Sequence, residues 1–84
     1  MHFSMLSFLL RVPDTADADA LLSEAYACLE QGLCYDEIND WEQTLGMYER
    51  GLHLIKEAQK TKNAKKSELY KHLMDAKESV ERRL

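Results

Sequence analysis

The chain has 84 residues and a formal net charge of −4, and 45% of its residues are hydrophobic while 31% are charged. This length allows one small domain and excludes a second one. Three glycines and one proline, together with this balance of apolar and charged residues, favour a compact helical protein over a disordered or an all-β chain.

The first twelve residues, MHFSMLSFLLRV, form an apolar stretch. No lysine or arginine precedes it, Arg11 interrupts it, and it is much shorter than a membrane span. The sequence therefore predicts no direct membrane insertion, although Ala18-Asp19-Ala20 has the form of a signal-peptide cleavage site and leaves that alternative open. We expect residues 1–16 to be an arm and linker that packs on the domain or on a partner, through one apolar helical face: Phe3, Leu6 and Leu10.

The first long pattern predicts a helix over about residues 17–35. Pro13 restricts the residue before it, and Asp14, Thr15 or Asp17 can cap the first N–H groups. Apolar residues then recur at intervals of three and four, which is typical of a helix that buries one face: Leu22, Ala25, Leu29 and Leu33.

A short acidic turn over residues 36–40 precedes the second helix. Asn39 and Glu42 have the spacing of a capping box, so helix two is predicted to start there and to end near residue 60. Its apolar stripe has the same helical spacing and comprises Trp41, Leu45, Tyr48, Leu52 and Ile55.

The connection over residues 60–63 contains neither glycine nor proline, so one unbroken helix beyond it is the alternative. Crowded lysines, with Thr61 and Asn63, favour a turn. Helix three then resumes near Ala64, with an apolar stripe of Leu69, Leu73, Ala76, Val80 and Leu84. Short connections predict an all-α, antiparallel three-helix bundle of up-down-up topology over residues 17–84.

Charge is divided unevenly along the chain. Residues 14–50 carry ten acidic residues and one basic residue, whereas residues 51–84 carry nine basic and five acidic residues. This asymmetry favours an acidic hairpin docked on a basic third helix, and it also suits the orientation of a charged peptide between them.

No catalytic, metal or cofactor signature is present in the sequence. Cys28 and Cys34 point in different directions on a helix and are interpreted as reduced thiols, and the three histidines lack metal-ligand spacing. No serine or cysteine has an identifiable base, and no glycine-rich phosphate loop occurs. Because the lysine-rich segment alternates with acids and contains one aromatic residue, nucleic-acid binding is not expected. We therefore expect a protein that is not an enzyme.

Each helix carries more apolar surface than one packing contact requires. Exposed apolar lines bordered by charge are typical of a site that binds a helix in a groove. We predict that such a groove joins helices one and three through Leu21, Cys28, Tyr35, Tyr70, Met74 and Lys77. An alternative groove uses Met47, Leu54 and Ala58 of helix two. A broad bundle core is the competing explanation for the same lines.

Glycines inside helices indicate close packing. Gly46 and Gly51 each cost helix two up to about 1 kcal/mol relative to alanine. We expect a neighbouring backbone to approach both of them, and also Gly32 near the end of helix one.

The pattern resembles the MIT (microtubule interacting and trafficking) domain over residues 17–84. The residues that carry the resemblance are Ala25-Tyr26, Gly32-Leu33, Asp36-Glu37-Ile38, Tyr48, and Gly51-Leu52 followed by His53-Leu54-Ile55. The resemblance implies a three-helix bundle that binds C-terminal helical or extended motifs of ESCRT-III subunits in an interhelical groove. It also implies a monomeric cytoplasmic module that recruits a larger parent protein to endosomes, to the midbody in cytokinesis or to lipid-droplet traffic.

Two other protein classes share parts of the pattern. A TPR-like helical adaptor is suggested by the spacing of Trp41 and Tyr48, but a 34-residue repeat does not occur twice. A self-associating coiled coil requires helices two and three to be continuous.

Overall fold

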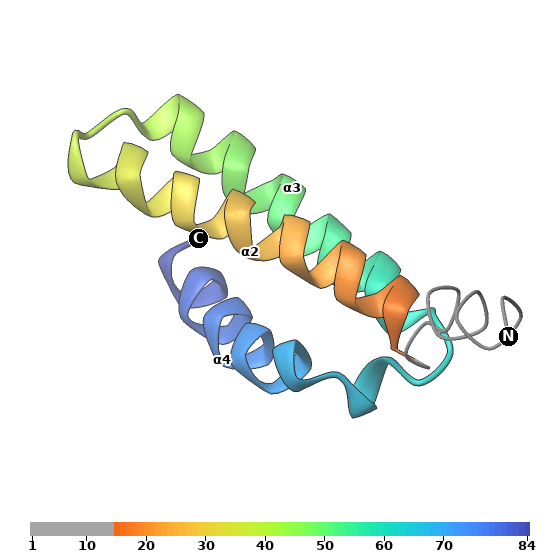
Figure 1. Cartoon of the computed structure of the whole chain (residues 1–84). Coiled ribbons are helices and arrows are strands. Elements are labelled where there is room, and N and C mark those ends of the chain that lie inside the picture. Colours follow the sequence, from red (N-terminus) through yellow and green to blue (C-terminus); the bar gives the residue numbers. More distant parts are fainter. Residues whose placement is uncertain (1–14) are drawn as a thin grey trace, which may run out of the picture.

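The computed structural model describes residues 15–84, which fold into three α-helices and contain no strand. Helix α2 spans Ala16–Glu37, α3 spans Trp41–Gln59 and α4 spans Glu68–Arg83, with a 3-10 turn over Ala64–Lys66 before α4. In Figure 1, α3 returns antiparallel to α2, and α4 then runs beside α2 in its direction. The predicted all-α three-helix bundle is confirmed. The predicted arm lies almost wholly outside the described residues.

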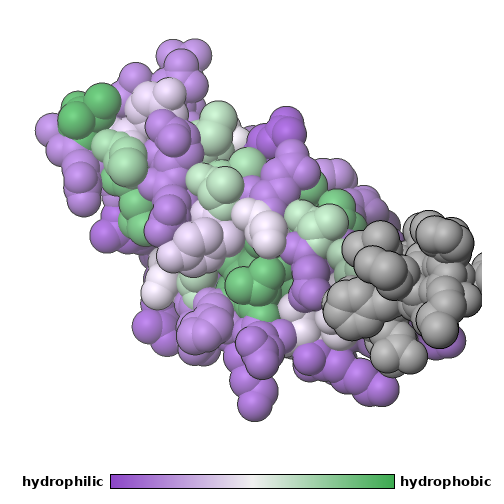
Figure 2. All heavy atoms as spheres, in the orientation of Figure 1, coloured by the Kyte–Doolittle hydropathy of each residue, from purple (hydrophilic) through white to green (hydrophobic). Residues whose placement is uncertain are grey.

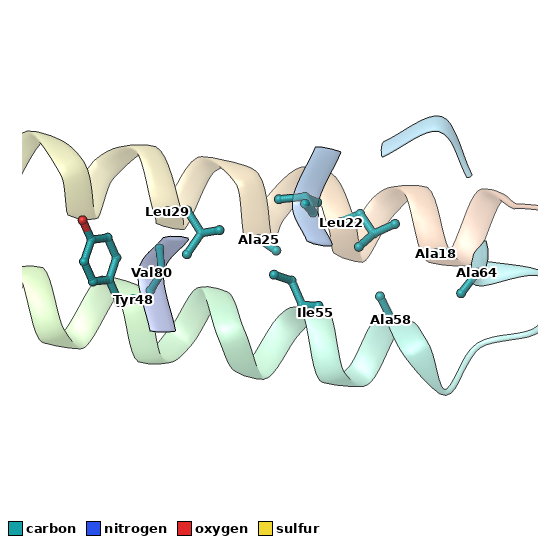
Figure 3. Packing of buried hydrophobic residues seen from close by; sticks show 10 residues of the cluster. Ala18, Leu22, Ala25, Leu29, Tyr48, Ile55, Ala58, Ala64 and Val80 are labelled. Atoms are coloured by element: carbon teal, nitrogen blue, oxygen red, sulfur yellow. The ribbon is translucent and has the colours of Figure 1, made fainter. Parts of the chain in front are cut away.

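Small residues let α2 and α3 approach closely along their length. Alanines of both helices are buried in this contact, and the larger side chains of Leu22, Tyr48 and Ile55 fill the space between them. Figure 3 shows these side chains pointing from one helix toward the other. Helix α4 adds Leu73 and Val80 to the same core. Most apolar burial therefore stabilises the α2–α3 hairpin.

Close packing is found at Gly32 and Gly51 but not at Gly46, and only at Gly51 is a neighbouring backbone atom, the Ala25 carbonyl oxygen, among the nearest atoms. A Cβ at Gly32 would lie 2.5 Å from the Tyr48 ring, and one at Gly51 would lie 2.6 Å from the Leu29 side chain. A Cβ at Gly46 would meet nothing within 4 Å. Gly46 faces solvent, so helical spacing alone misassigned it.

The α2–α3 turn is a Schellman motif followed at once by a helix cap. Asn39 adopts a left-handed conformation with φ of 62°, its N–H donates to the Asp36 carbonyl, and the Asp40 N–H donates to the Tyr35 carbonyl. The Asp40 carboxylate then accepts a hydrogen bond from the Gln43 N–H at 3.3 Å. The capping box predicted for Asn39 and Glu42 is therefore wrong: Asn39 serves the helix that ends, and Asp40 caps the one that begins.

A real break separates α3 from α4, so the unbroken helix is excluded. Asn63 has a φ of 64°, which a continuous helix cannot contain. Helix α4 begins four residues later than predicted, because Ala64–Lys66 form the 3-10 turn and Ser67 is extended. The Ser67 hydroxyl caps α4 by accepting a hydrogen bond from the Leu69 N–H at 3.2 Å.

Polar contacts fasten α4 to α2 near both of its ends. The Ser67 hydroxyl donates to Asp19, whose other carboxylate oxygen accepts from the Thr15 hydroxyl at 2.8 Å. At the far end, Arg83 pairs with Asp36. Within residues 15–84, this is the only ion pair between α4 and the acidic hairpin, so the expected broad charge pairing is limited to that point.

Candidate functional site

An apolar groove follows the boundary between α2 and α4. Tyr26 is 46% exposed and Leu33 is 42% exposed, and both lie on the side of α2 that borders α4. Figure 2 shows apolar surface along this boundary. The apolar stripe of the sequence predicted that Leu33 lies in the core. That prediction was wrong, because α4 does not cover Leu33 and the groove is open beside it.

Two shallow hollows make up the groove. The first has a volume of about 380 Å³ and is lined by Tyr26, Leu69 and His72. The second has a volume of about 320 Å³, and its lining residues are Leu29, Leu33, Ala76, Ser79, Val80 and Arg83. Leu29 and Val80 are buried core residues, so the floor of the second hollow is formed by the core itself. This hollow is therefore a direct outward continuation of the core.

Acidic side chains border the groove along α2. A hydrogen bond to the Glu30 carboxylate raises the pKa of the Tyr26 phenol above its ordinary value. The Asp36–Arg83 pair closes one end of the groove, and the contact between Asp19 and Ser67 closes the other. The arrangement is an apolar floor between polar ends, which suits an amphipathic segment.

A further hollow of about 550 Å³ lies at the start of α4. Its lining is polar and mixes both charges: Lys65, Lys66, Ser67, Glu68, Lys71, His72 and Asp75. It has no core residue in its floor, so it offers little apolar burial to a helix. We therefore place the candidate site in the α2–α4 groove.

The predicted α2 line does not face α4. Leu21, Cys28 and Tyr35 follow one another at intervals of seven residues and share one flank. Cys28 is buried beside Arg50 of α3, whose guanidinium pairs with Glu24 at 2.8 Å. Glu24 is the larger cause, and Cys28 the smaller one, of the raised pKa of Arg50. The line therefore borders α3 and not α4.

The predicted α4 line faces the other side of α3. The Gln59 amide nitrogen lies 3.6 Å from the sulfur of Met74, and Tyr70 and Lys77 share that side of α4 by spacing. Gln59 and Arg50 are nine residues apart, which places them on opposite sides of α3 at about 100° per residue. Met74 and Cys28 thus lie on opposite faces of the hairpin, and the six residues predicted to form one groove are not brought together.

The alternative groove is also divided. Ala58 is fully buried in the α2–α3 core, so it offers no surface to a partner. Met47 and Leu54 are half-buried, and Met47 approaches Gly32 on the flank away from α4. These two residues therefore extend the flank of Leu21 and Cys28 instead of forming a groove with α4.

The sequence reasoning missed Tyr26, Leu33 and His72 as groove residues. Leu33 belongs to the predicted stripe of α2 and Tyr26 lies one residue from Ala25 of that stripe, and spacing alone cannot separate a core position from the rim beside it. Rim positions differ from core positions in their angle around the axis of α2. Asp19, Tyr26 and Leu33 repeat every seven residues on the opposite edge of the stripe from Leu21 and Cys28.

Within residues 15–84, no three His, Cys, Asp or Glu side chains are grouped so that they could hold a metal ion. None of the helices in this part of the chain is both long and apolar enough to cross a membrane. In comparisons with known proteins, no family model, no curated protein and no solved structure matches the chain.

Proposed function

We propose that this chain is a non-enzymatic protein-interaction module that binds an amphipathic peptide helix in the α2–α4 groove. The observation that carries the proposal is the exposed apolar pair of Tyr26 and Leu33 beside hollows floored by core residues. Large apolar side chains in a groove with polar ends favour a helix that inserts residues at intervals of three and four.

The resemblance to the MIT domain, most of all to that of spartin, supports C-terminal motifs of ESCRT-III subunits as the partner class. Binding of this kind recruits the parent protein to endosomal sorting or abscission sites. The two other classes fit the structure less well. The break at Asn63 removes the continuous helix that the coiled coil needs, and α4 packs as a third bundle helix beside a single hairpin.

The test is a titration of the labelled protein with peptides from ESCRT-III C-termini, followed by amide chemical-shift changes. We expect saturable shifts along α2 and α4 with a Kd below about 1 mM. Leu33→Asp is expected to weaken binding about tenfold or more, because it puts a charge into the apolar groove. Met47→Asp, on the opposite flank, is the matched control and leaves the Kd unchanged.

Different results would contradict the proposed partner class and the proposed binding site. If no peptide binds by about 1 mM, the ESCRT-III assignment is lost. If peptides bind but Met74→Asp weakens them while Leu33→Asp does not, the site lies between α3 and α4 instead.

A further inference from the structure

The end of the α2–α3 hairpin exposes two large apolar side chains that the groove does not use. Ile38 is 69% exposed and Trp41 is 49% exposed, and only two residues lie between them. Figure 2 shows apolar surface at this end of the molecule, apart from the α2–α4 groove. We define the hairpin tip as Glu37, Ile38, Trp41 and Glu42.

The tip is held in a fixed conformation by its own backbone. Hydrogen bonds from Asn39 and Asp40 close the end of α2, and the Thr44 hydroxyl donates to the Asp40 carbonyl at 2.8 Å. These hydrogen bonds are made by the backbone and by the Thr44 hydroxyl. The conformation of the turn therefore does not depend on the side chains of Ile38 and Trp41. The two side chains are displayed on a preorganised turn, which lowers the entropy lost on binding.

Glu37 opposes the local stability of α2 at the tip, whereas Glu42 lies in the first turn of α3, where the helix dipole favours an anion. Asp36 and Glu37 lie in the last turn of α2, where the helix dipole favours cations, and that turn contains no basic residue. Arg83 pairs with Asp36. For Glu37 and Glu42 no ion pair is formed within residues 15–84, and the sequence has no lysine, arginine or histidine between residues 12 and 49. Glu37 thus works against the local fold while it remains exposed, which points to a role outside that fold.

We propose that the hairpin tip is a second docking surface, which binds an arginine-bearing basic segment of another protein. Arginine combines the features that this surface complements. Its guanidinium pairs with the carboxylates of Glu37 and Glu42, its plane stacks on the Trp41 ring, and its aliphatic stem covers Ile38. Ile38, Trp41 and Glu42 line neither hollow of the α2–α4 groove, whereas Glu37 shares a hollow with Leu33 and Arg83 at its end. Trp41→Ala, and not Glu37→Lys, therefore separates this proposal from the peptide-helix function.

The experiment titrates the full chain with the synthetic peptide acetyl-Leu-Arg-Arg-Leu-Arg-Arg-amide and follows Trp41 fluorescence and amide shifts. Shifts are expected at residues 36–42, with weaker binding as salt is raised. Trp41→Ala and Glu37→Lys are each expected to weaken binding about tenfold. Glu37→Lys should also keep or raise the melting temperature, because it places a cation at the C-terminus of α2, so lost binding cannot be attributed to unfolding.

The matched control is Glu49→Lys, which makes the same charge change at another exposed position of α3 and leaves the peptide Kd within about twofold if the tip is the site. An equal loss with Glu49→Lys and Glu42→Lys overturns the proposal in favour of general attraction to an acidic protein. Concentration-dependent self-association in sedimentation, abolished by Glu42→Lys, overturns it in favour of a second copy as the occupant, through its lysines at residues 60–66.

Discussion

Three glycines of similar appearance in the sequence have opposite roles in the structure. Gly32 and Gly51 lie where a methyl group would collide with Tyr48 and Leu29, whereas Gly46 borders open space. The first two let α2 and α3 approach each other, and the third only weakens its helix. Propensity arguments treat them alike, because only the neighbouring helix distinguishes them.

We predict that Gly46→Ala raises the free energy of unfolding by about 1 kcal/mol, because it removes the conformational cost of glycine in a helix. Gly32→Ala should lower it by about 1–3 kcal/mol, because the rigid Tyr48 ring has to move. Thermal unfolding by circular dichroism measures both changes. A destabilising Gly46→Ala would mean that another surface covers that position.

Tyr48 is fully buried, and its hydroxyl has no hydrogen-bond partner among the described residues. Burial raises the pKa of this phenol above its ordinary value of 10.0. The unfolded chain therefore releases the Tyr48 proton before the folded chain does. The stability that the folded state gains from this raised pKa is complete below pH 10 and is lost as the pH rises above 10.

Tyr48→Phe removes the unpartnered hydroxyl and should raise the free energy of unfolding by about 1 kcal/mol at neutral pH. The variant also lacks the alkaline loss, so its advantage over the wild type should widen above pH 10. Urea denaturation at several pH values measures the difference. A constant difference across pH 10 would show that the phenol ionises equally in both states.

At the scale of the elements, the turns were harder to predict than the helices. Helical spacing located α2 and α3 within about two residues, because each buries one face for its whole length. It misjudged the caps, because Asn39 and Asp40 are both competent cap residues and only backbone geometry decides which one serves which helix. For the same reason, α4 starts at Glu68 and not at Ala64 as predicted. Its start is set by the cap residue Ser67 and not by the apolar pattern.

The left-handed conformation of Asn39 gives a test of the turn. Asn39→Gly should raise the free energy of unfolding by about 0.5 kcal/mol, because glycine adopts this φ without steric cost. Asn39→Ala is the matched comparison and should lower it by about 1 kcal/mol. If alanine were the more stable of the two, residue 39 would not hold a positive φ in solution.

At the scale of the whole molecule, the fold was predictable and the site was not. The residues that resemble the MIT domain include Gly32, Tyr48 and Gly51, and these are the residues through which α2 and α3 pack. They therefore report on the hairpin and carry little information on the groove. To place Leu21 and Cys28 correctly, one has to know which side of α2 is covered by α4. That side depends on how the bundle winds and not on the spacing of apolar residues.

The bundle is also uneven in stability. Helix α4 buries Leu73 and Val80 fully or nearly so, but it packs mainly against α2 and touches α3 little. We predict that amide hydrogen exchange is faster in α4 than in the middle of α2 and α3, because α4 can detach without opening the hairpin. A saturating groove peptide should slow exchange in α4 selectively. Equal protection in all three helices would show a single cooperative unit.

The close α2–α3 contact has a consequence for how this module can diversify. The side chains that hold the hairpin together are mostly small and fully enclosed, whereas Tyr26, Leu33 and the hairpin tip take no part in that contact. Substitutions in these exposed positions can therefore accumulate without reaching the joint between the helices. The outer surface of the bundle can thus change in sequence while the α2–α3 scaffold stays fixed.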